Sequence, residues 1–244
     1  MILTVAFGKG GTGKTSTACA LAGCAREAGR RVLCVDCDPQ SNFTYCLGGD
    51  PSQPGLYAVL TGKASCAEIL QRTEQCDLLP AGLDLAAAEA SIDNKPMTLR
   101  DALEPLKGGY DLIVIDTQPS LSSVQFNALC ASDGVLLPME ADTFSMMGLY
   151  QMAQTIEQAQ KVNRSLKVAG ILLTRYKPKQ LLAGEVRQDI EQQARAMGTK
   201  VFDTYIREGV AVKQAQALQQ SLFDYAPKSN PANDYRALFA ELDL

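Results

Sequence analysis

A short glycine- and lysine-rich segment near the start of the chain has the composition of a phosphate-binding loop. Residues 8–16 read GKGGTGKTS, which fits the pattern GxxxxGK[ST]. The glycines let backbone N–H groups approach phosphate oxygens, and a helix beginning near Lys14 would point its positive end at the same anion. Lys14 then supplies charge for the β- and γ-phosphates, while the Thr15 hydroxyl is placed to bind Mg²⁺. The predicted nucleotide-binding residues are Gly8, Lys9, Gly10, Gly11, Thr12, Gly13, Lys14, Thr15 and Ser16.

A second lysine, Lys9, stands at the outer rim of this loop, five residues before Lys14. A loop built for one triphosphate does not need this lysine locally. Lys9 could reach a phosphate held by another subunit, or it could be an ordinary solvated surface lysine. Its position alone leaves both interpretations open.

Three aspartates follow two apolar runs that read as strands. Asp36 and Asp38 are two residues apart, so both can face the same side at the end of a strand. Asp116 follows the apolar run 112–115, and Pro119 breaks the chain just beyond. A single aspartate at a strand end is often only a helix cap, but ligands of open α/β sheets bind at this edge. Because three carboxylates would repel a polyanion unless a cation lay between them, we predict Mg²⁺ here.

The elements that must position these residues alternate along the whole chain, with no linker and no internal repeat. Nearly continuous apolar strands are typical of a parallel sheet covered on both faces. We therefore predict one α/β domain over residues 1–244, with a doubly wound, mostly parallel sheet and helices on both faces. The predicted strands are Ile2–Phe7, Arg31–Asp36, Cys76–Pro80, Asp111–Asp116, Gly134–Pro138 and Lys167–Thr174. The predicted helices are Lys14–Ala28, Leu99–Leu106, Leu121–Ala131, Phe144–Val162 and Leu181–Met197.

The end of the chain predicts one more helix, with Asn230 as its cap and Pro231 in its first turn. Its apolar residues recur at helical spacing, and its polar face lacks the lysines and arginines of a membrane-binding helix. We therefore expect this helix to dock on the core through Tyr235, Leu238, Phe239 and Leu242.

The composition excludes several kinds of protein. The chain has 244 residues and no histidine, which rules out Ser-His-Asp, Cys-His and HExxH chemistry. A formal charge of −4 excludes a uniformly basic nucleic-acid binder. Residues 164–213 nevertheless hold ten Lys/Arg against five Asp/Glu, and local potential matters more than net charge near a ligand. We call these residues the basic segment.

The first residues lack the positive region of a signal peptide, and no stretch approaches the roughly 18 apolar residues of a membrane span. We therefore expect a cytoplasmic protein with no membrane partner, whose eight cysteines are reduced and mostly small core residues. Cys34 and Cys37 lie on a predicted strand at odd spacing, so they point to opposite faces and favour the core over a metal site.

Three segments together resemble the deviant Walker-motif ATPases, the ParA/MinD/nitrogenase-iron-protein superfamily. They are Lys9 to Ser16, Asp36–Asn42 and Asp111–Leu121. With Tyr110 before it, the last of these segments reads YDLIVIDTQPSL and is similar to the switch segment of the family. The segments 78–89, 134–149, 168–180 and 201–225 also match, so the resemblance covers nearly the whole chain. The chain is most similar to the small, Soj-like ParA DNA-partition ATPases.

The resemblance implies an ATP hydrolase with ATP and Mg²⁺ as cofactors. Two ATP-bound protomers would form a homodimer in which Lys9 reaches the phosphates of the partner. Lys14 and Thr15 would bind ATP and Mg²⁺, and Asp38 would position the attacking water. The catalytic residues would then be Lys9, Lys14 and Asp38, with Thr15, Asp36 and Asp116 holding the Mg²⁺ directly or through water.

The resemblance also implies a cycle on DNA. The ATP dimer would bind DNA non-specifically on the nucleoid, and slow hydrolysis, stimulated by a ParB-like partner, would release it. The process would be partition of a plasmid, a chromosome or a mobile element. Because the first predicted strand starts at Ile2, we expect no N-terminal helix-turn-helix extension and no repression of an operator.

The chain departs from the family pattern at three places. Gln118 stands where a first proline is usual before Pro119, Ile206 is followed by Arg207 rather than proline, and Ala211 occupies a position that is often basic. A merely solvated charged face is the alternative to DNA binding by the basic segment. The candidate DNA-binding residues are Lys177, Lys179, Arg207 and Lys213.

Two other functions in the superfamily remain as alternatives. A MinD-like regulatory or positioning ATPase, which does not act on DNA, would carry a basic amphipathic C-terminus that this chain lacks. An iron–sulfur protein would need two cluster cysteines near a dimer axis. Cys130 is a candidate, but the sequence shows no convincing second cysteine to pair with it.

Overall fold

A single eight-stranded sheet forms the centre of the computed structural model, which describes residues 1–82, 84–92, 94–178 and 183–243. Within these residues the strand order is β3-β4-β2-β5-β1-β6-β7-β8, and all neighbours are parallel except the antiparallel pair β3–β4. The strands are β1 (Ile2–Val5), β2 (Val32–Cys37), β3 (Gln71–Arg72), β4 (Asp77–Leu79), β5 (Leu112–Thr117), β6 (Gly134–Met139), β7 (Lys167–Thr174) and β8 (Val201–Ile206).

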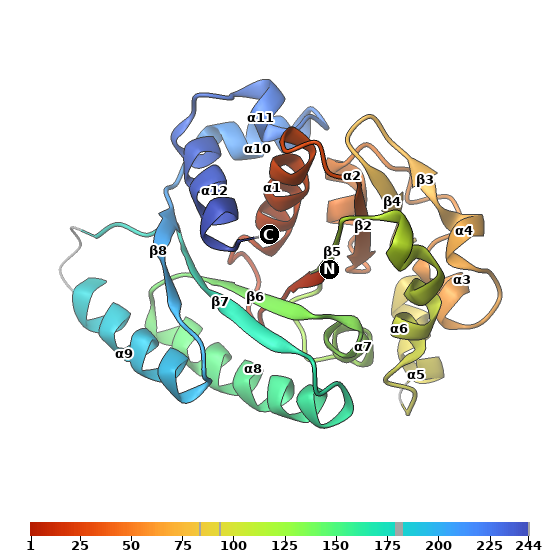
Figure 1. The fold of residues 1–244 in the computed structure, drawn as a ribbon, viewed down its shortest axis with the longest axis horizontal. Coiled ribbons are helices and arrows are strands. Elements are labelled where there is room, and N and C mark those ends of the chain that lie inside the picture. The colour runs from red at the N-terminus through yellow and green to blue at the C-terminus, as the bar shows by residue number, and fades with distance from the viewer. Residues whose placement is uncertain (83, 93, 179–182, 244) are drawn as a thin grey trace.

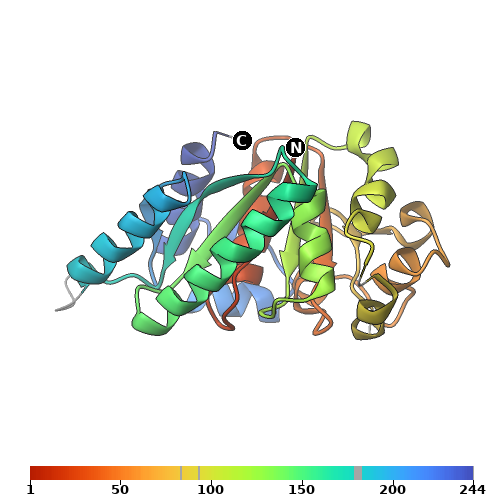
Figure 2. The ribbon, with the colours of Figure 1, turned by 90° about the horizontal axis from the view of Figure 1, so that it is seen from below.

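Helices lie on both sides of this sheet, as a doubly wound fold requires. Helices α1, α10, α11 and α12 lie on one side, and α7, α8 and α9 lie on the other, as Figures 1 and 2 show. The helices are α1 (Lys14–Glu27), α2 (Asn42–Cys46), α3 (Leu56–Leu60), α4 (Cys66–Ile69), α5 (Glu89–Ile92), α6 (Thr98–Leu103), α7 (Ser123–Ala131), α8 (Thr143–Val162), α9 (Ala183–Ala196), α10 (Val210–Ala217), α11 (Leu222–Tyr225) and α12 (Asn230–Glu241). Two 3₁₀ helices cover Leu85–Ala88 and Glu104–Gly109.

The central strands are buried on both faces, which confirms the predicted fold class. Successive residues of β5 alternate between two cores, with Val114 packed under α1 and Ile115 packed on the α7 side. The two cysteines of β2 divide in the same way, since Cys34 belongs to the first core and Cys37 to the second. The prediction that they point to opposite faces is therefore confirmed, and all eight cysteines are free.

The C-terminal helix α12 docks on the core as predicted. Tyr235 and Leu238 are buried, while Phe239 and Leu242 pack against the same core with part of their surface exposed. The predicted cap was wrong by one residue, because Ser229 accepts the hydrogen bond from the N–H of Ala232. None of the helices in the described residues combines the length and the apolar character needed to span a membrane.

The sequence prediction missed two strands at the edges of the sheet. β3 has only two residues, and β8 mixes buried and exposed positions, so neither has a continuous apolar run. The helix predicted over Leu99–Leu106 ends at Leu103 because Pro105 begins a 3₁₀ turn there. The first two residues predicted for the helix Leu181–Met197 lie outside the described residues, and α9 is described from 183 onward.

Candidate nucleotide site

The glycine-rich loop connects the end of β1 to the start of α1, as predicted. Gly11 and Gly13 have φ angles of 78° and 88°, a left-handed conformation that other residue types adopt at a cost. Gly13 is the N-cap of α1 and offers no side chain to its first turn. The backbone N–H groups of that turn are therefore arranged for an external anion.

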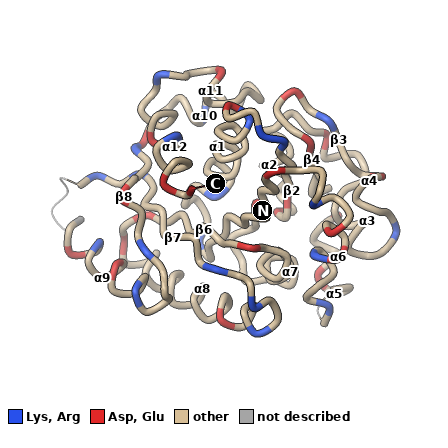
Figure 3. The backbone as a smooth tube through the Cα atoms, viewed as in Figure 1, with Lys and Arg blue, Asp and Glu red and all other residues tan. Residues whose placement is uncertain are grey.

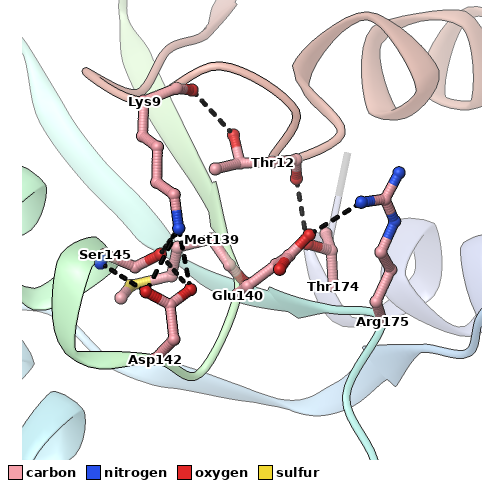
Figure 4. Close-up of polar contacts among 8 residues, drawn as sticks. All are labelled: Lys9, Thr12, Met139, Glu140, Asp142, Ser145, Thr174 and Arg175. Carbon is pink, nitrogen blue, oxygen red and sulfur yellow. Dashed lines mark hydrogen bonds and ion pairs between the residues drawn. The ribbon is translucent and has the colours of Figure 1, made fainter.

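Thr174, at the end of β7, anchors this loop to the sheet. Its hydroxyl donates to the carbonyl of Thr12 at 2.9 Å and approaches the carbonyl of Met139 at 3.3 Å, as Figure 4 shows. The next residue, Arg175, adopts a φ of 50° and pairs with Glu140 at 2.8 Å. The loop is thus held from below by two strands, which fixes where a phosphate can sit.

Lys14 is almost completely buried at the centre of the loop. Only 6% of its surface is exposed, and its Nζ donates to the carbonyl oxygen of Lys9 at 3.1 Å. Burial lowers the pKa of Lys14, against the opposing effect of Asp116 and Asp38, which favour the charged form. The buried ammonium group of Lys14 would gain a charge-assisted hydrogen bond if an anion bound beside it.

Asp116 and Thr15 form a pair below the loop. The Thr15 hydroxyl donates to Oδ2 of Asp116 at 2.7 Å, whereas Oδ1 of Asp116 is buried and has no hydrogen-bond partner among the described residues. Asp36 lies directly opposite on the neighbouring strand. Burial, and then the nearby charge of Asp36, raise the pKa of Asp116 well above its ordinary value. A buried carboxylate oxygen without a partner is a position that a cation or a bound water fits.

The two aspartates after β2 have different contacts. Both oxygens of Asp36 are engaged: Oδ1 accepts from the N–H of Asp38 at 3.0 Å, and Oδ2 accepts from the N–H and hydroxyl of Thr44 at 2.8 and 2.7 Å. Burial raises the pKa of Asp36 to about 6 despite these bonds. Asp38 instead lines the cavity, with its Oδ1 accepting from the N–H of Gln40 at 2.9 Å. Asp36 therefore shapes the loop that presents Asp38.

No three acidic or thiol side chains of the described residues converge closely enough to hold a metal by themselves. The predicted meeting of three carboxylates is thus looser than expected, with Asp116 facing Thr15 and Asp36 turned into its own loop. This arrangement fits Mg²⁺ better than a metal that needs a full protein cage. Mg²⁺ usually takes one or two protein ligands and completes its shell with phosphate oxygens and water.

Lys9 is neither free in solvent nor directed at the phosphate position of its own loop. Its Nζ lies 2.9 and 3.1 Å from the two carboxylate oxygens of Asp142 and 3.2 Å from the hydroxyl of Ser145 (Figure 4). Asp142 is also the N-cap of α8, where it accepts from the N–H of Ser145 at 2.9 Å. Sequence reasoning missed both residues. An aspartate at the start of the long predicted helix was the available signal.

A cavity of about 380 Å³ extends from the phosphate loop toward the connection between β8 and α10. Its polar end holds the loop and Asp38, and its other end is formed by residues near Ile206 and Val212. This volume is within the range of small-molecule sites. The residues after β8 that line it are Ile206, Arg207, Glu208, Gly209, Val212, Lys213 and Gln216.

Two of the candidate DNA-binding residues are engaged in ion pairs within the folded chain. Lys177 pairs with Glu208 at 3.4 Å, and the guanidinium of Arg207 pairs with Asp234 at 2.6 Å. Arg207 and Lys213 both line the nucleotide cavity. Lys179 lies outside the described residues. The basic segment therefore contributes to the site already described as well as to the surface.

The departure at Gln118, just after β5, has a structural explanation. The side-chain amide of Gln118, in place of a proline, donates to Glu89 at 3.0 Å, and Glu89 accepts from the N–H of Ser123 at 2.7 Å. This ties the loop to α5 through a residue that the sequence did not single out. Cys130, on α7, is fully buried in the core, which does not favour a role as a cluster ligand at a dimer axis.

Comparisons with known proteins agree with this site. A family model described as AAA domain matches residues 1–168. The chromosome-partitioning ATPase Soj of Thermus thermophilus is 38% identical over 242 residues, covering 98% of this chain and 94% of that protein. The sporulation initiation inhibitor protein Soj of Bacillus subtilis is 34% identical over 249 residues, covering 99% and 97%.

A solved structure with the same fold supports the same assignment. Cobyrinic acid a,c-diamide synthase from Mycobacterium smegmatis, with bound ADP and magnesium, superposes with a TM-score of 0.84. The two chains are 32% identical, and the match covers 98% of this chain and 92% of that one.

Proposed function

The chain belongs to the AAA-domain family of the Soj and ParA partition ATPases, and from this premise we propose that it is a Mg²⁺-dependent molecular switch that acts in DNA partition. The chain is an ATP hydrolase of this family. One observation carries the assignment of its chemistry: Lys14 and Thr15 line one cavity, and Thr15 is hydrogen-bonded to Asp116, whose other carboxylate oxygen has no partner among the described residues. Each is a group whose interactions are completed by a nucleotide and its cation.

ATP and Mg²⁺ are the cofactors, and the residues present fit both. The cavity accommodates a molecule of nucleotide size, with N–H groups of the loop at its polar end. Thr15 and Asp116 would hold the cation, and Asp36 adds negative charge one strand away. When bound, Mg²⁺ neutralises the charge that builds up on the β- and γ-phosphates.

The residues around the phosphates would each carry a distinct task. Lys14 would exchange the carbonyl of Lys9 for phosphate oxygens, and so hold the triphosphate in line. Asp38 would orient the attacking water from its place in the cavity wall, and Asp36 would keep the Asp38 loop in position through Thr44. In-line attack needs positioning and charge neutralisation rather than covalent catalysis, which is consistent with a site that has no histidine.

Two ATP-bound chains would form a homodimer in which Lys9 leaves Asp142 and reaches the partner's phosphates. The ion pair between Lys9 and Asp142 supports such a movement, because about a third of each side chain remains exposed, at 34% and 33%. Pairs exposed to this degree contribute roughly 1 kcal/mol or less, so they can be exchanged for a charged ligand.

The dimer would bind DNA non-specifically, and hydrolysis would release it. Contacts to phosphates would come from Lys177, Lys179, Arg207 and Lys213, and the protein would be cytoplasmic, on the nucleoid when ATP is bound. A ParB-like activator protein would accelerate the slow hydrolysis. The basic segment and the similarity to the chromosome-partitioning ATPase Soj support this part of the proposal.

The experiment that tests the proposal combines nucleotide state and DNA binding. A gel shift with long non-specific DNA is run with Mg-ATP, with ATP and EDTA, and with Mg-ADP, beside a light-scattering measurement of mass. We expect dimers and shifted DNA with Mg-ATP only. A monomer in all three conditions contradicts the switch, and a dimer that leaves the DNA unshifted contradicts the role in partition.

A further inference from the structure

Two cysteines that the proposed reaction does not use line the same small cavity behind the phosphate loop. Cys19 follows Thr15 by four residues on α1, which places both on the same face of the helix. Cys46 is the last residue of α2, and 9% of its surface is exposed. The thiols of Cys19 and Cys46 share a hydrogen bond, although 27 positions separate them in the sequence.

The two thiols face a small cavity between α1, α2 and α10. Its volume of about 20 Å³ holds one water-sized molecule, and its walls include Cys19, Cys46, Gln75 and Gln216. Cys19 is only partly buried, so the pair has a route to solvent. A metal site is not indicated, because no group of three ligating side chains occurs within the described residues.

We propose that Cys19 and Cys46 are a redox-modification site, at which a small peroxide converts the two thiols into a reversible disulfide that links α1 to α2. The small cavity that both residues line and the partial exposure of Cys19 carry this assignment, and the hydrogen bond between the two thiols supports it. A second thiol pair, Cys34 with Cys76, is in contact nearby, but Cys34 is fully buried within the central strand β2.

The chemistry uses the hydrogen bond between the two thiols. Because Cys19 donates to Cys46, the pKa of Cys46 is lowered and the pKa of Cys19 is raised, so Cys46 is the thiol of the pair that loses its proton more readily. The Cys46 sulfur attacks one peroxide oxygen, the O–O bond breaks, and hydroxide leaves with the other oxygen. The resulting sulfenic acid is attacked by the sulfur of Cys19, the S–O bond breaks, and the disulfide forms. Two electrons pass from the thiols to hydrogen peroxide, and the two thiol protons complete two molecules of water.

A bond between these residues would connect the two segments that surround the γ-phosphate position. Helix α1 starts with Lys14 and Thr15, and α2 follows the loop that carries Asp38. The residue before α2, Ser41, has a φ of 54° and a buried hydroxyl without a partner within the described residues. The Ser41 hydroxyl is therefore available to bind a ligand or a water molecule. A crosslink through α2 would restrict how the loop before α2 moves when a ligand binds.

The effect on turnover rests on the proposed ATPase function, whereas formation of the disulfide does not. The test treats the reduced full-length chain with hydrogen peroxide, then alkylates the free thiols and maps the disulfides by mass spectrometry. In parallel it measures phosphate release and the binding of a fluorescent ATP analogue. We expect a Cys19–Cys46 disulfide, and a turnover that falls by about tenfold to a hundredfold, the range for a misplacement of ~1 Å near reacting groups. Dithiothreitol should restore the turnover, and analogue binding should persist.

Cys19→Ser and Cys46→Ser provide the matched comparison, with Cys76→Ser as the control from the neighbouring pair. The turnover of the first two variants should be unaffected by peroxide, whereas the turnover of the control should still fall. The proposal is overturned if the Cys19–Cys46 peptide is absent, if the disulfide forms without a change in turnover, or if inactivation persists in Cys46→Ser. If a serine variant fails to fold, peptide mapping of the unmodified chain still decides whether the bond forms. Absence of phosphate release before any peroxide is added contradicts the ATPase function instead.

Discussion

The phosphate-loop edge and the basic segment both carry charged residues, but their charges are arranged in opposite ways. At the edge, Lys14 and Asp116 are buried, and one oxygen of Asp116 lacks a partner among the described residues. In the basic segment, Lys177 and Arg207 pair with Glu208 and Asp234 on the surface. Figure 3 shows acidic and basic positions close together along β8 and α9. A buried charged group that lacks a partner indicates a binding site for a ligand. A surface charge that is already paired contributes less electrostatic attraction to an incoming ligand.

The largest effect is expected from Lys14→Ala, which removes the only lysine side chain buried at the phosphate edge within the described residues. The loss of charge-assisted hydrogen bonds to phosphate should weaken ATP binding by about 3 kcal/mol or more, a factor above roughly a hundred. Calorimetry measures the affinity. Lys213→Ala, at the other end of the same cavity, is the control and should change the affinity far less. If both variants lose ATP affinity equally, the buried lysine is no more important for ATP binding than the lysine at the other end of the cavity.

Asp38→Ala should separate hydrolysis from binding. The variant lacks the carboxylate that we propose to orient water, so turnover should fall by about a hundredfold, the typical scale for loss of one acid–base group. ATP affinity should stay close to normal, and the ATP dimer should accumulate in light scattering. Gln40→Ala, two residues further along the same loop, serves as the control. A monomer at saturating Mg-ATP counts against the role of Asp38.

Asp116→Asn should stabilise the ligand-free chain at neutral pH while weakening its response to Mg²⁺. The pKa of Asp116 is raised on folding, so the stability that this carboxyl gives is full at low pH and is lost as pH rises through its folded pKa. The neighbouring Asp36, with a pKa of about 6, behaves in the same way between its ordinary pKa and pH 6. The variant should therefore gain about 1 kcal/mol at pH 7.5, or roughly 2–4 °C in Tm, and less at pH 5.

Thermal melts with and without Mg-ATP measure this difference. Asp111→Asn at the start of the same strand is the matched control. The pKa of Asp111 is lowered by its hydrogen bonds with Arg31, so its effect on stability has the opposite sign. If Asp116→Asn is less stable than the unmodified chain at pH 7.5, the ionised carboxylate of Asp116 does not destabilise the ligand-free fold. The proposed contrast between the buried and the surface charges would then be wrong.

Asp142→Asn should have a smaller effect on dimerisation. Releasing Lys9 from its ion pair removes an interaction of roughly 0.5–1 kcal/mol from the monomer, so dimers should form at an ATP concentration about two- to fivefold lower. The Asn side chain can still cap α8. Sedimentation across an ATP titration gives the midpoint, and Glu140→Gln, on the neighbouring Arg175 pair, is the control. A midpoint shifted to higher ATP would show that Asp142 assists the dimer.

Glu208→Gln tests the basic segment and should give the smallest effect. Freeing Lys177 from its partner adds about one positive charge for DNA, so affinity should rise a few-fold at low salt and the slope of log K against log salt should steepen by about 0.9. Filter binding across a salt series measures both. Because Glu208 also lines the cavity, ATP affinity is measured in parallel, and Lys177→Gln should move DNA affinity the other way. Unchanged slopes in both variants would place the DNA contacts elsewhere.

The parts of the molecule that sequence predicts best are those whose chemistry is local. The phosphate loop is continuous in sequence, and the apolar run before Asp116 identifies its strand. Burial of both sheet faces likewise follows from strands that are nearly continuous apolar runs. By contrast, β8 mixes exposed and buried positions with no apolar run, and its pairing with β7 is a contact that the local sequence does not show.

Partners that are distant in sequence could not be predicted. Lys9 and Asp142 lie 133 positions apart, and Lys177 and Glu208 meet only because the ends of β7 and β8 are neighbours. The same holds for the second cysteine of the Cys19–Cys46 pair. Composition gave the charge of the basic segment correctly, but it does not say which acidic residues of the folded chain neutralise it.

Asp142 both pairs with Lys9 and caps α8, and the cap would lower the free-energy cost of the proposed departure of Lys9. When the ammonium leaves, the carboxylate still accepts the amide of Ser145 and remains at the positive end of a 20-residue helix. Such a position is worth about 0.3–1 kcal/mol to an anion, so the helix end serves as a stand-in counter-charge. In the proposed cycle the carboxylate of Asp142 would therefore keep a favourable partner whether Lys9 is bound to it or released.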